Sequence, residues 1–145
     1  MLRRSGSTRI LEHRVCIDPA VAERFELPHD ARFLRLVRVR LGDGGPLSIE
    51  SAWYSLNTAP SLENADPSGS MYAQLIEGGL QLSYCEQTME AALPTKSQCA
   101  IFGYDTPVPC LLIKRSTFES RGIMLEYVEG LFRGDSYTCR LRLDY

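Results

Sequence analysis

The sequence predicts an α+β fold, in which a mostly antiparallel β-sheet is flanked by short helices. The clearest strand centres on Val37. Alternation places Val37, Val39 and Leu41 on one face of it, and Arg38 and Arg40 on the other. The last three strand-like segments are joined by connections of only a few residues, whereas a parallel crossover needs about a dozen or more. Helix signals cover only short stretches of the chain.

Seven segments are predicted to be strands, and residues that favour turns separate most of them. The Gly-Asp-Gly-Gly stretch at 42–45 tolerates positive φ and therefore predicts a hairpin between the second and third strands. The predicted strands cover residues 10–17, 33–41, 47–55, 81–92, 110–118, 124–133 and 136–143.

Three short helices are predicted from their terminal residues. Asp18 can cap a helix, and Pro19 fits the first helical position after it. A pair of glycines ends the helix at 70–76. Thr95 and Gln98 have the spacing of a capping box, which predicts that a third helix begins there.

The chain has 145 residues and a mass of 16.3 kDa, which fits one domain. We assign residues 10–145 to that domain and residues 1–9 to a polar tail. The net charge of −2, from 16 basic and 18 acidic residues, argues against a nucleic-acid partner for this part. No apolar run approaches the ~18 residues of a membrane span, and no secretory signal is recognisable. We expect no membrane partner.

The five cysteines are odd in number, widely spread and without a C-x-x-C pair, and the two histidines lie far from any paired cysteine. Zinc sites need close pairs of ligands. We therefore expect reduced, mostly packed thiols in a cytoplasmic protein, with no metal and no cofactor.

Charged residues share one face of the predicted sheet. Arg38 and Arg40 lie two apart on one strand, Glu50 lies on the next, and Glu126 lies on a later one. Guanidinium groups recognise phosphate or carboxylate, and carboxylates accept bonds from hydroxyl or amide groups, so this face could bind a small anion. Ser70, at a helix start, is either a simple cap or a further anion contact. The alternative is the solvated face of a half-covered sheet, and spacing alone favours it.

Catalytic motifs are missing from the sequence. It holds no G-x-S-x-G, P-loop or G-x-G-x-x-G stretch, and no histidine–cysteine arrangement that would activate a nucleophile. Both histidines lie in the first thirty residues, so acid–base catalysis by histidine has little support. We expect no catalytic residue.

Four stretches of the sequence resemble a known family. They are Arg-Leu-Val-Arg-Val-Arg-Leu-Gly-Asp-Gly-Gly-Pro-Leu-Ser-Ile-Glu at 35–50, Gly-Ser-Met-Tyr-Ala-Gln-Leu at 69–75, Leu-Glu-Tyr at 125–127 and Phe-Arg-Gly-Asp-Ser-Tyr at 132–137. In this order they resemble the UTRA domain, the effector-sensing half of HutC-type regulators of the GntR family. The resemblance runs from about residue 10 to residue 143.

This resemblance implies a chorismate lyase-like fold and a ligand site. In family members that respond to sugar phosphates, the positions of Arg38, Arg40 and Ser70 hold the phosphate, and those of Glu50 and Glu126 hold the sugar. Phe132 stands where such members place a ligand-facing tyrosine. The missing hydroxyl removes one hydrogen bond, a net loss of about 0.5–1.5 kcal/mol.

The resemblance also implies a role. We expect an effector-binding and dimerisation domain that binds a small anionic metabolite, either a sugar phosphate or a carboxylate, and forms a homodimer. DNA would be contacted only through a winged helix-turn-helix domain, which we expect to be absent from this chain together with its linker. One alternative is a chorismate lyase-like enzyme that uses Arg38 or Arg40 with Glu126. Another is a dimerisation module that has lost its ligand.

Overall fold

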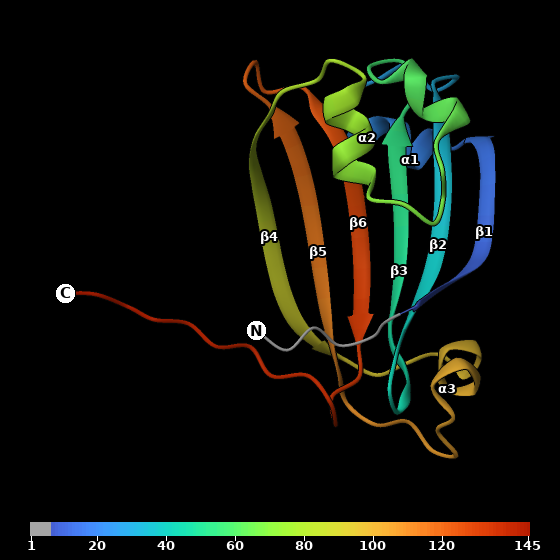
Figure 1. The fold of residues 1–145 in the computed structure, drawn as a ribbon, viewed down its shortest axis with the longest axis vertical. Coiled ribbons are helices and arrows are strands. Elements are labelled where there is room, and N and C mark those ends of the chain that lie inside the picture. The colour runs from blue at the N-terminus through green and yellow to red at the C-terminus, as the bar shows by residue number, and fades with distance from the viewer. Residues whose placement is uncertain (1–6) are drawn as a thin grey trace.

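The computed structural model describes residues 7–145, and their strands form one antiparallel sheet in the order β1-β2-β3-β6-β5-β4 (Figure 1). The strands are β1 (Ser7–Ile17), β2 (Arg32–Gly42), β3 (Gly45–Ser55), β4 (Leu82–Ala92), β5 (Cys110–Glu119) and β6 (Met124–Phe132). The helices are α1 (Pro19–Arg24), α2 (Met71–Glu77), α3 (Lys96–Phe102) and a short 3-10 helix at Pro60–Asn64. The predicted α+β class is confirmed. No helix in the described part of the chain is long and apolar enough to span a bilayer.

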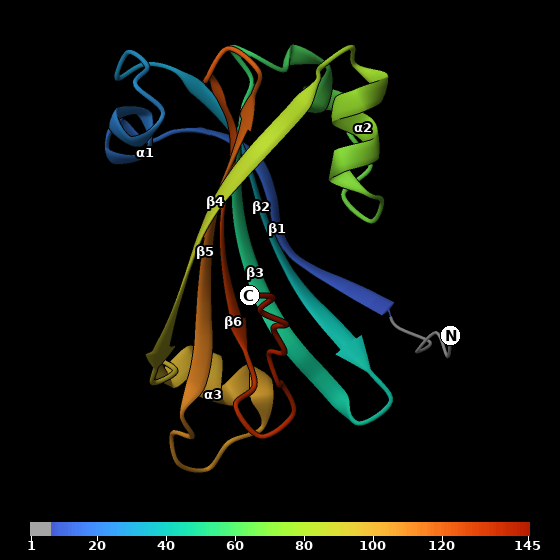
Figure 2. The same ribbon diagram turned by 90° about the vertical axis from the view of Figure 1, so that its left-hand side faces the viewer.

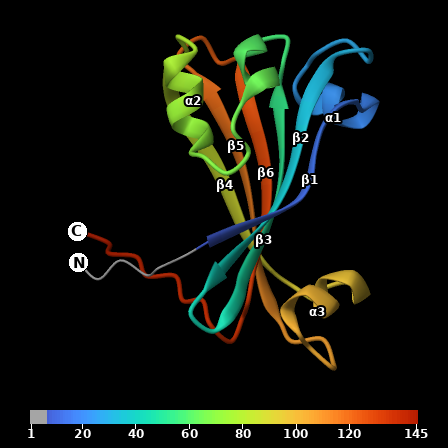
Figure 3. The same cartoon turned by 45° about the vertical axis from the view of Figure 1, so that its right-hand side comes forward.

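The helices cover both faces of the sheet. Leu75 of α2 and Leu62 of the 3-10 helix pack on one face against a cluster that includes Leu36. On the opposite face, Phe25 after α1 packs near one end of the sheet, and Phe102 of α3 packs near the other. Figure 2 shows α1 and α2 on opposite sides, and Figure 3 shows α3 at the far end from α1. No helix of residues 7–145 covers the lower half of the face on which α2 lies (Figure 2).

The helix caps form as the sequence predicts. The Asp18 side chain accepts a hydrogen bond from the backbone N–H of Val21 at 3.2 Å. The Ser70 hydroxyl accepts one from Ala73 at the same distance. Thr95 and Gln98 exchange side-chain and backbone bonds of 3.2 and 2.8 Å, which is the capping box expected from their spacing. These caps satisfy backbone donors that a helix start leaves without partners.

The first strand begins earlier than predicted. β1 starts at Ser7, and its register pairs Thr8 with Arg40 and Arg9 with Val39. Residues 7–9 therefore belong to the sheet rather than to the predicted tail, because β2 is long enough to pair with them. The remainder of that tail, residues 1–6, lies outside the described residues.

The predicted strand at 136–143 is wrong. The structure places these residues after β6 in an exposed segment without strand pairing. A hairpin with β6 is blocked because β6 already has β3 on one side and β5 on the other. The alternation at 136–143 is a local property of the sequence, whereas the availability of a sheet edge depends on the whole topology.

The prediction that the thiols are mostly packed is only partly right. Cys99 and Cys110 are buried and Cys16 is half-buried, but Cys85 and Cys139 are exposed. All five are free thiols. Cys85 lies in β4 and Cys139 in the segment after β6, and most residues of both segments are exposed to solvent.

Candidate functional site

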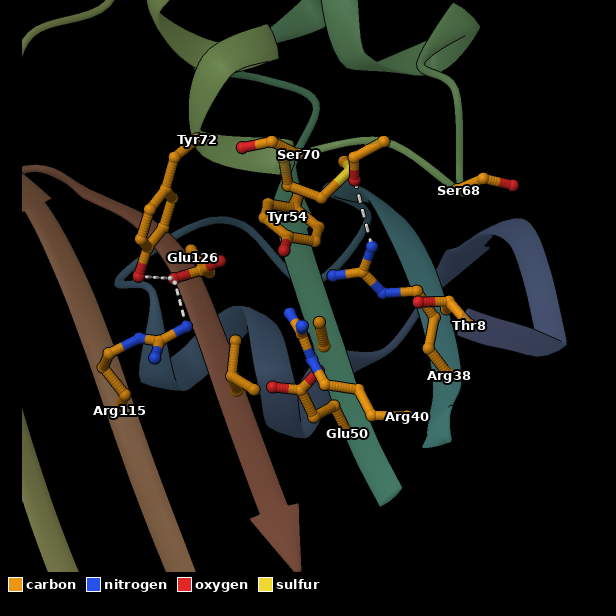
Figure 4. Close-up of a pocket in the computed structure, with 14 residues that line it drawn as sticks. Thr8, Arg38, Arg40, Glu50, Tyr54, Ser68, Ser70, Tyr72, Arg115 and Glu126 are labelled. Carbon is orange, nitrogen blue, oxygen red and sulfur yellow. Dashed lines mark hydrogen bonds and ion pairs between the residues drawn. The ribbon is translucent and has the colours of Figure 1, made fainter. Parts of the chain in front are cut away.

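A polar cavity of about 370 Å³ lies between the sheet and the segment that leads into α2 (Figure 4). Its floor is formed by side chains of β2, β3, β5 and β6 that share one face, and its roof by Ser68, Gly69 and Ser70 with the first turn of α2. Small-molecule sites are typically clefts of roughly 300–1,000 Å³, so this cavity has the volume of a metabolite site.

The cavity brings together five of the six residues singled out from the sequence: Arg38, Arg40, Glu50, Ser70 and Glu126. Strand register explains their convergence, because Arg38 pairs with Glu50 across β2 and β3, and Glu126 pairs with Tyr54 across β6 and β3. Cross-strand partners project from the same face of a sheet. The structure does not place Phe132 in this cavity.

Phe132 instead lines an adjoining cavity of about 160 Å³, which shares Glu50, Arg115 and Val128 with the first. The Phe132 ring lies against Tyr137, with 4.6 Å between the ring centroids. A methyl group added at Gly130 would lie 2.9 Å from the Phe132 ring, so the glycine leaves room for this ring to lie over β6. The rings of Phe132 and Tyr137 thus form an aromatic side of the second cavity.

Glu126 is the most deeply buried charged residue of the site, with an exposed fraction of 1%. One of its carboxylate oxygens accepts hydrogen bonds from the Thr117 hydroxyl at 2.8 Å and from the Tyr72 hydroxyl at 3.2 Å. The guanidinium of Arg115 lies 3.5 Å from the same oxygen. These three partners compensate the burial of the carboxylate, which alone in an apolar interior would be costly.

Burial and the negative charge of Glu126 shift the pKa values of the groups around it. Burial, and then the negative charge of Glu126, raises the pKa of Tyr54 well above its ordinary value of 10.0. The same two causes raise the pKa of Tyr72. Burial, the largest single influence, would lower the pKa of Arg115. The negative charge of Glu126, together with smaller contributions from Tyr72, Tyr54 and Glu50, outweighs burial, and the pKa is raised. Both tyrosine hydroxyls therefore remain hydrogen-bond donors at neutral pH.

We expect the free energy of unfolding to fall as pH rises above about 10, because Tyr54 then ionises more readily in the unfolded chain than in the fold. A raised folded-state pKa gives a contribution that is complete below the unfolded pKa and is lost as pH approaches the folded pKa. Tyr54→Phe should remove this contribution, so the variant should lose less stability than the parent between about pH 9 and 11. Urea unfolding at several pH values measures the difference, and parallel losses in both proteins would contradict it.

The three arginines of the cavity differ in their partners. Arg40 forms a 2.8 Å ion pair with Glu50, and Arg115 pairs with Glu126. Arg38 forms no ion pair with any carboxylate of residues 7–145, and one of its terminal nitrogens donates to the carbonyl oxygens of Pro67 and Gly69 at 3.2 and 3.1 Å. Those bonds hold the guanidinium in place without neutralising it. Arg38 is thus the uncompensated positive charge of the cavity.

The two sides of the cavity differ in their polar groups. Thr8 and Ser68 lie on the side of Arg38, and Tyr72, Arg115 and Glu126 lie on the opposite side, with Ser70 at the roof between them (Figure 4). The Ser70 oxygen accepts the cap bond from Ala73, which leaves its own proton free to donate. We call the Arg38 side the donor end and the Glu126 side the carboxylate end. The cavity therefore offers donors to an anion at one end and acceptors to hydroxyl groups at the other.

Five polar residues of the cavity were not singled out from the sequence: Thr8, Tyr54, Ser68, Tyr72 and Arg115. Thr8 was assigned to the tail, and Tyr72 follows the helix cap without any pattern that marks it. Arg115 carried a usable signal, because alternation along β5 places it on one face with Ile113 and Thr117, and Thr117 pairs with Glu126. That signal requires the β5–β6 register to be known. No group of three or more potential metal-ligating side chains occurs among residues 7–145.

Comparison with known proteins identifies the family to which the chain is related. Residues 2–138 match the model of the UTRA domain. The chain is 30% identical over 111 residues to the HTH-type transcriptional repressor NagR of Bacillus subtilis (strain 168), covering 76% of this chain and 46% of that protein. It is 29% identical over 109 residues to the HTH-type transcriptional repressor PhnF of Mycolicibacterium smegmatis, covering 74% and 45%. The chain thus spans about half the length of these relatives.

Solved structures show the same fold. The effector domain of PhnF from Mycobacterium smegmatis superposes with a TM-score of 0.89 at 24% identity, covering 97% of this chain and 88% of that one. The C-terminal domain of the histidine utilization repressor from Pseudomonas syringae gives 0.87 at 20% identity, covering 97% and 99%. The match to the family model covers nearly the whole chain, and on that ground the chain belongs to the UTRA domain family.

Proposed function

We propose that this domain senses a small anionic metabolite for a GntR-type transcriptional regulator, and that the cavity under α2 is the effector site. The observation that carries the proposal is the uncompensated charge of Arg38 in a cavity that is also lined by the hydroxyl groups of Thr8, Ser68 and Ser70. Arginine binds phosphate or carboxylate through two parallel hydrogen bonds, and a phosphate or carboxylate group would supply the missing counter-charge.

The carboxylate end supports a ligand with hydroxyl groups. Glu126 presents acceptor oxygens two strands away from Arg38, Glu50 presents them on the strand between, and the Tyr72 hydroxyl adds a donor. A sugar phosphate combines an anionic group with several hydroxyls and fits this division. A hydroxylated carboxylate fits it as well, so the proposal covers both classes. It gives the domain no catalytic step.

The proposal also includes a homodimer in which each copy carries one effector site. NagR and PhnF are HTH-type transcriptional repressors of about twice the matched length, so DNA would be contacted by a part of the regulator outside the matched region. A bound effector can change DNA binding only by favouring one of two arrangements of the dimer, through a difference in its affinity for them. The effector would thereby set the spacing of the two DNA-binding parts.

The proposal is tested with pairs of ligands that differ only in the anionic group. We expect a phosphorylated sugar, or a small carboxylate, to raise the melting temperature in a dose-dependent way, while the uncharged sugar does not. A ligand at 100 times its Kd stabilises the fold by about 2.7 kcal/mol, a shift that thermal denaturation readily detects. Equal shifts with the charged and uncharged members, or no shift with any compound of the panel, would contradict an anion site. Release of an aromatic acid from chorismate would instead support the enzyme alternative.

A further inference from the structure

The segment after β6 has the sequence of a strand but pairs with no strand of residues 7–145. We call residues 136–145 the arm. Its apolar residues alternate with polar ones: Tyr137, Cys139, Leu141 and Leu143 against Thr138, Arg140, Arg142 and Asp144. Leu141 and Leu143 are 78% and 74% exposed. Such a row of exposed aliphatic side chains is normally covered by another surface.

The arm does not run along its own sheet. The Cys139 sulfur lies 3.9 Å from the Met89 sulfur of β4, so the arm reaches β4 at that point. Beyond it the arm continues outward past β4, as Figure 1 shows at the left. The neighbouring strand β6 is closed on both sides by β3 and β5. The arm therefore has the sequence pattern of a strand without strand pairing to the described part of its own protomer.

β4 offers a free edge of matching length. It is an eleven-residue strand that pairs only with β5 among the described strands, and most of its residues are exposed. Cys85, Gln87 and Met89 lie on the cavity face, because they pair with β5 residues of that face. Glu86 and Glu90 lie on the opposite face. A long open edge is a template for pairing with another strand.

The two faces of β4 complement the two faces of the arm. A strand added to β4 with its apolar row on the cavity face would place Leu141 and Cys139 beside Met89 and Cys85. The same orientation would place Arg140 and Arg142 on the face that carries Glu86 and Glu90. Opposite charges and apolar pairs on neighbouring strands each contribute roughly 0.2–1 kcal/mol.

The other sheet edge does not fit the arm in the same way. β1 carries Arg9, His13 and Arg14 along its length, with Glu12 as its one acidic residue. The two arginines of the arm would meet a mostly basic strand there. Like charges directly opposite each other on paired strands are destabilising. Charge therefore favours β4 over β1.

We propose that the arm of one copy pairs as an extra strand with the free edge of β4 in a second copy, and that the second arm does the same in return. The partner is a second copy because the exchange closes a two-fold dimer and uses both unsatisfied elements of each chain. This inference rests on the homodimer of the proposed function and not on the effector site. Tyr137, at the start of the arm, also lines the second cavity, so one segment contacts both the ligand-side surface and the proposed interface.

Charge exchange on the 145-residue chain tests the pairing. The arm variant carries Arg140→Glu and Arg142→Glu, the edge variant carries Glu86→Arg and Glu90→Arg, and the full variant carries all four. Light scattering after size-exclusion chromatography should give the parent twice the 16.3 kDa of one chain. The arm variant and the edge variant should each be monomeric. The full variant, and a mixture of the arm and edge variants, should be dimeric again because opposite charges face each other in both contacts.

Two controls separate the pairing from general effects of charge. Asp30→Arg with Asp105→Arg makes the same change in net charge as the edge variant, at exposed positions outside the arm and β4, and it should leave the dimer intact. Deletion of residues 136–145 should give a folded monomer, as circular dichroism and cooperative unfolding would show. A dimer that survives this deletion overturns the arm exchange alone. A monomeric parent overturns the homodimer as well, while the ligand panel still tests the effector site. A full variant that stays monomeric overturns the charge pairing.

Discussion

Replacing Arg38 by methionine is expected to weaken binding of a phosphate-bearing ligand about 10- to 100-fold. Hydrogen bonds to charged groups contribute about 1.5–3 kcal/mol each, and 1.4 kcal/mol corresponds to a tenfold change in Kd. Methionine keeps an unbranched stem of similar length but removes the charge and all of the donors. Because no carboxylate of residues 7–145 pairs with Arg38, its full charge is available to the ligand. Isothermal titration of the best ligand of the panel measures the loss.

Arg40→Met is the matched control, since Arg40 lies on the same face two residues further along β2. Its guanidinium is paired with Glu50 and 58% of its side chain is exposed, so a ligand must compete with that carboxylate. We expect a smaller loss for this variant. Arg38 also donates to the carbonyl oxygens of Pro67 and Gly69, so its replacement could shift the segment that forms the roof of the cavity. The melting temperature of unliganded Arg38→Met should be recorded, because it distinguishes such a shift from the loss of a ligand contact. Equal losses in both variants would contradict the assignment of Arg38 as the main anion contact.

The sequence could predict the face of the sheet that carries the site. Alternation assigns Arg38, Arg40 and Glu50 to one face of a hairpin, and the short turn between the strands leaves little freedom in their register. Glu126 could be included because its strand shows the same periodicity. The resemblance to the UTRA domain selected these same positions, and alternation alone could not distinguish a ligand site from a solvated face.

Long-range pairing could not be predicted. Arg115 enters the cavity only because β5 pairs with β6 in one register, and Thr8 enters because β1 pairs with β2 beyond the expected boundary. Phe132 was expected beside the ligand, but the structure places it over Gly130 in the adjoining cavity. The segment at 136–143 has the local pattern of a strand, yet its neighbour β6 has no free edge. These outcomes depend on which strands are neighbours, and a local pattern does not contain that information.

Glu126→Ala is expected to lower the free energy of unfolding by about 3 kcal/mol. Removal of one partner from a buried ion pair typically costs about 3–5 kcal/mol, because the other charge is left without compensation. The effect should lie at the lower end of this range, since the Arg115 side chain is 29% exposed and can be solvated through the cavity. The hydroxyls of Tyr72 and Thr117 would also lose their acceptor. Urea denaturation of the parent and the variant measures the difference.

Two further variants separate the charge from the hydrogen bonds. Glu126→Gln keeps an acceptor oxygen for Tyr72 and Thr117 but removes the charge that faces Arg115. The decrease in unfolding free energy of this variant therefore measures the contribution of the ion pair. Thr117→Val removes one donor with little change in shape, and a single hydrogen bond contributes about 0.5–1.5 kcal/mol. If Glu126→Ala destabilises the fold no more than Thr117→Val, the buried carboxylate does not organise the site. If the loss of unfolding free energy is largest for Glu126→Ala, smaller for Glu126→Gln and smallest for Thr117→Val, the carboxylate end is stabilised mainly by the charge of Glu126. The effector would then meet a preformed acceptor, and binding there would require no rearrangement of the sheet.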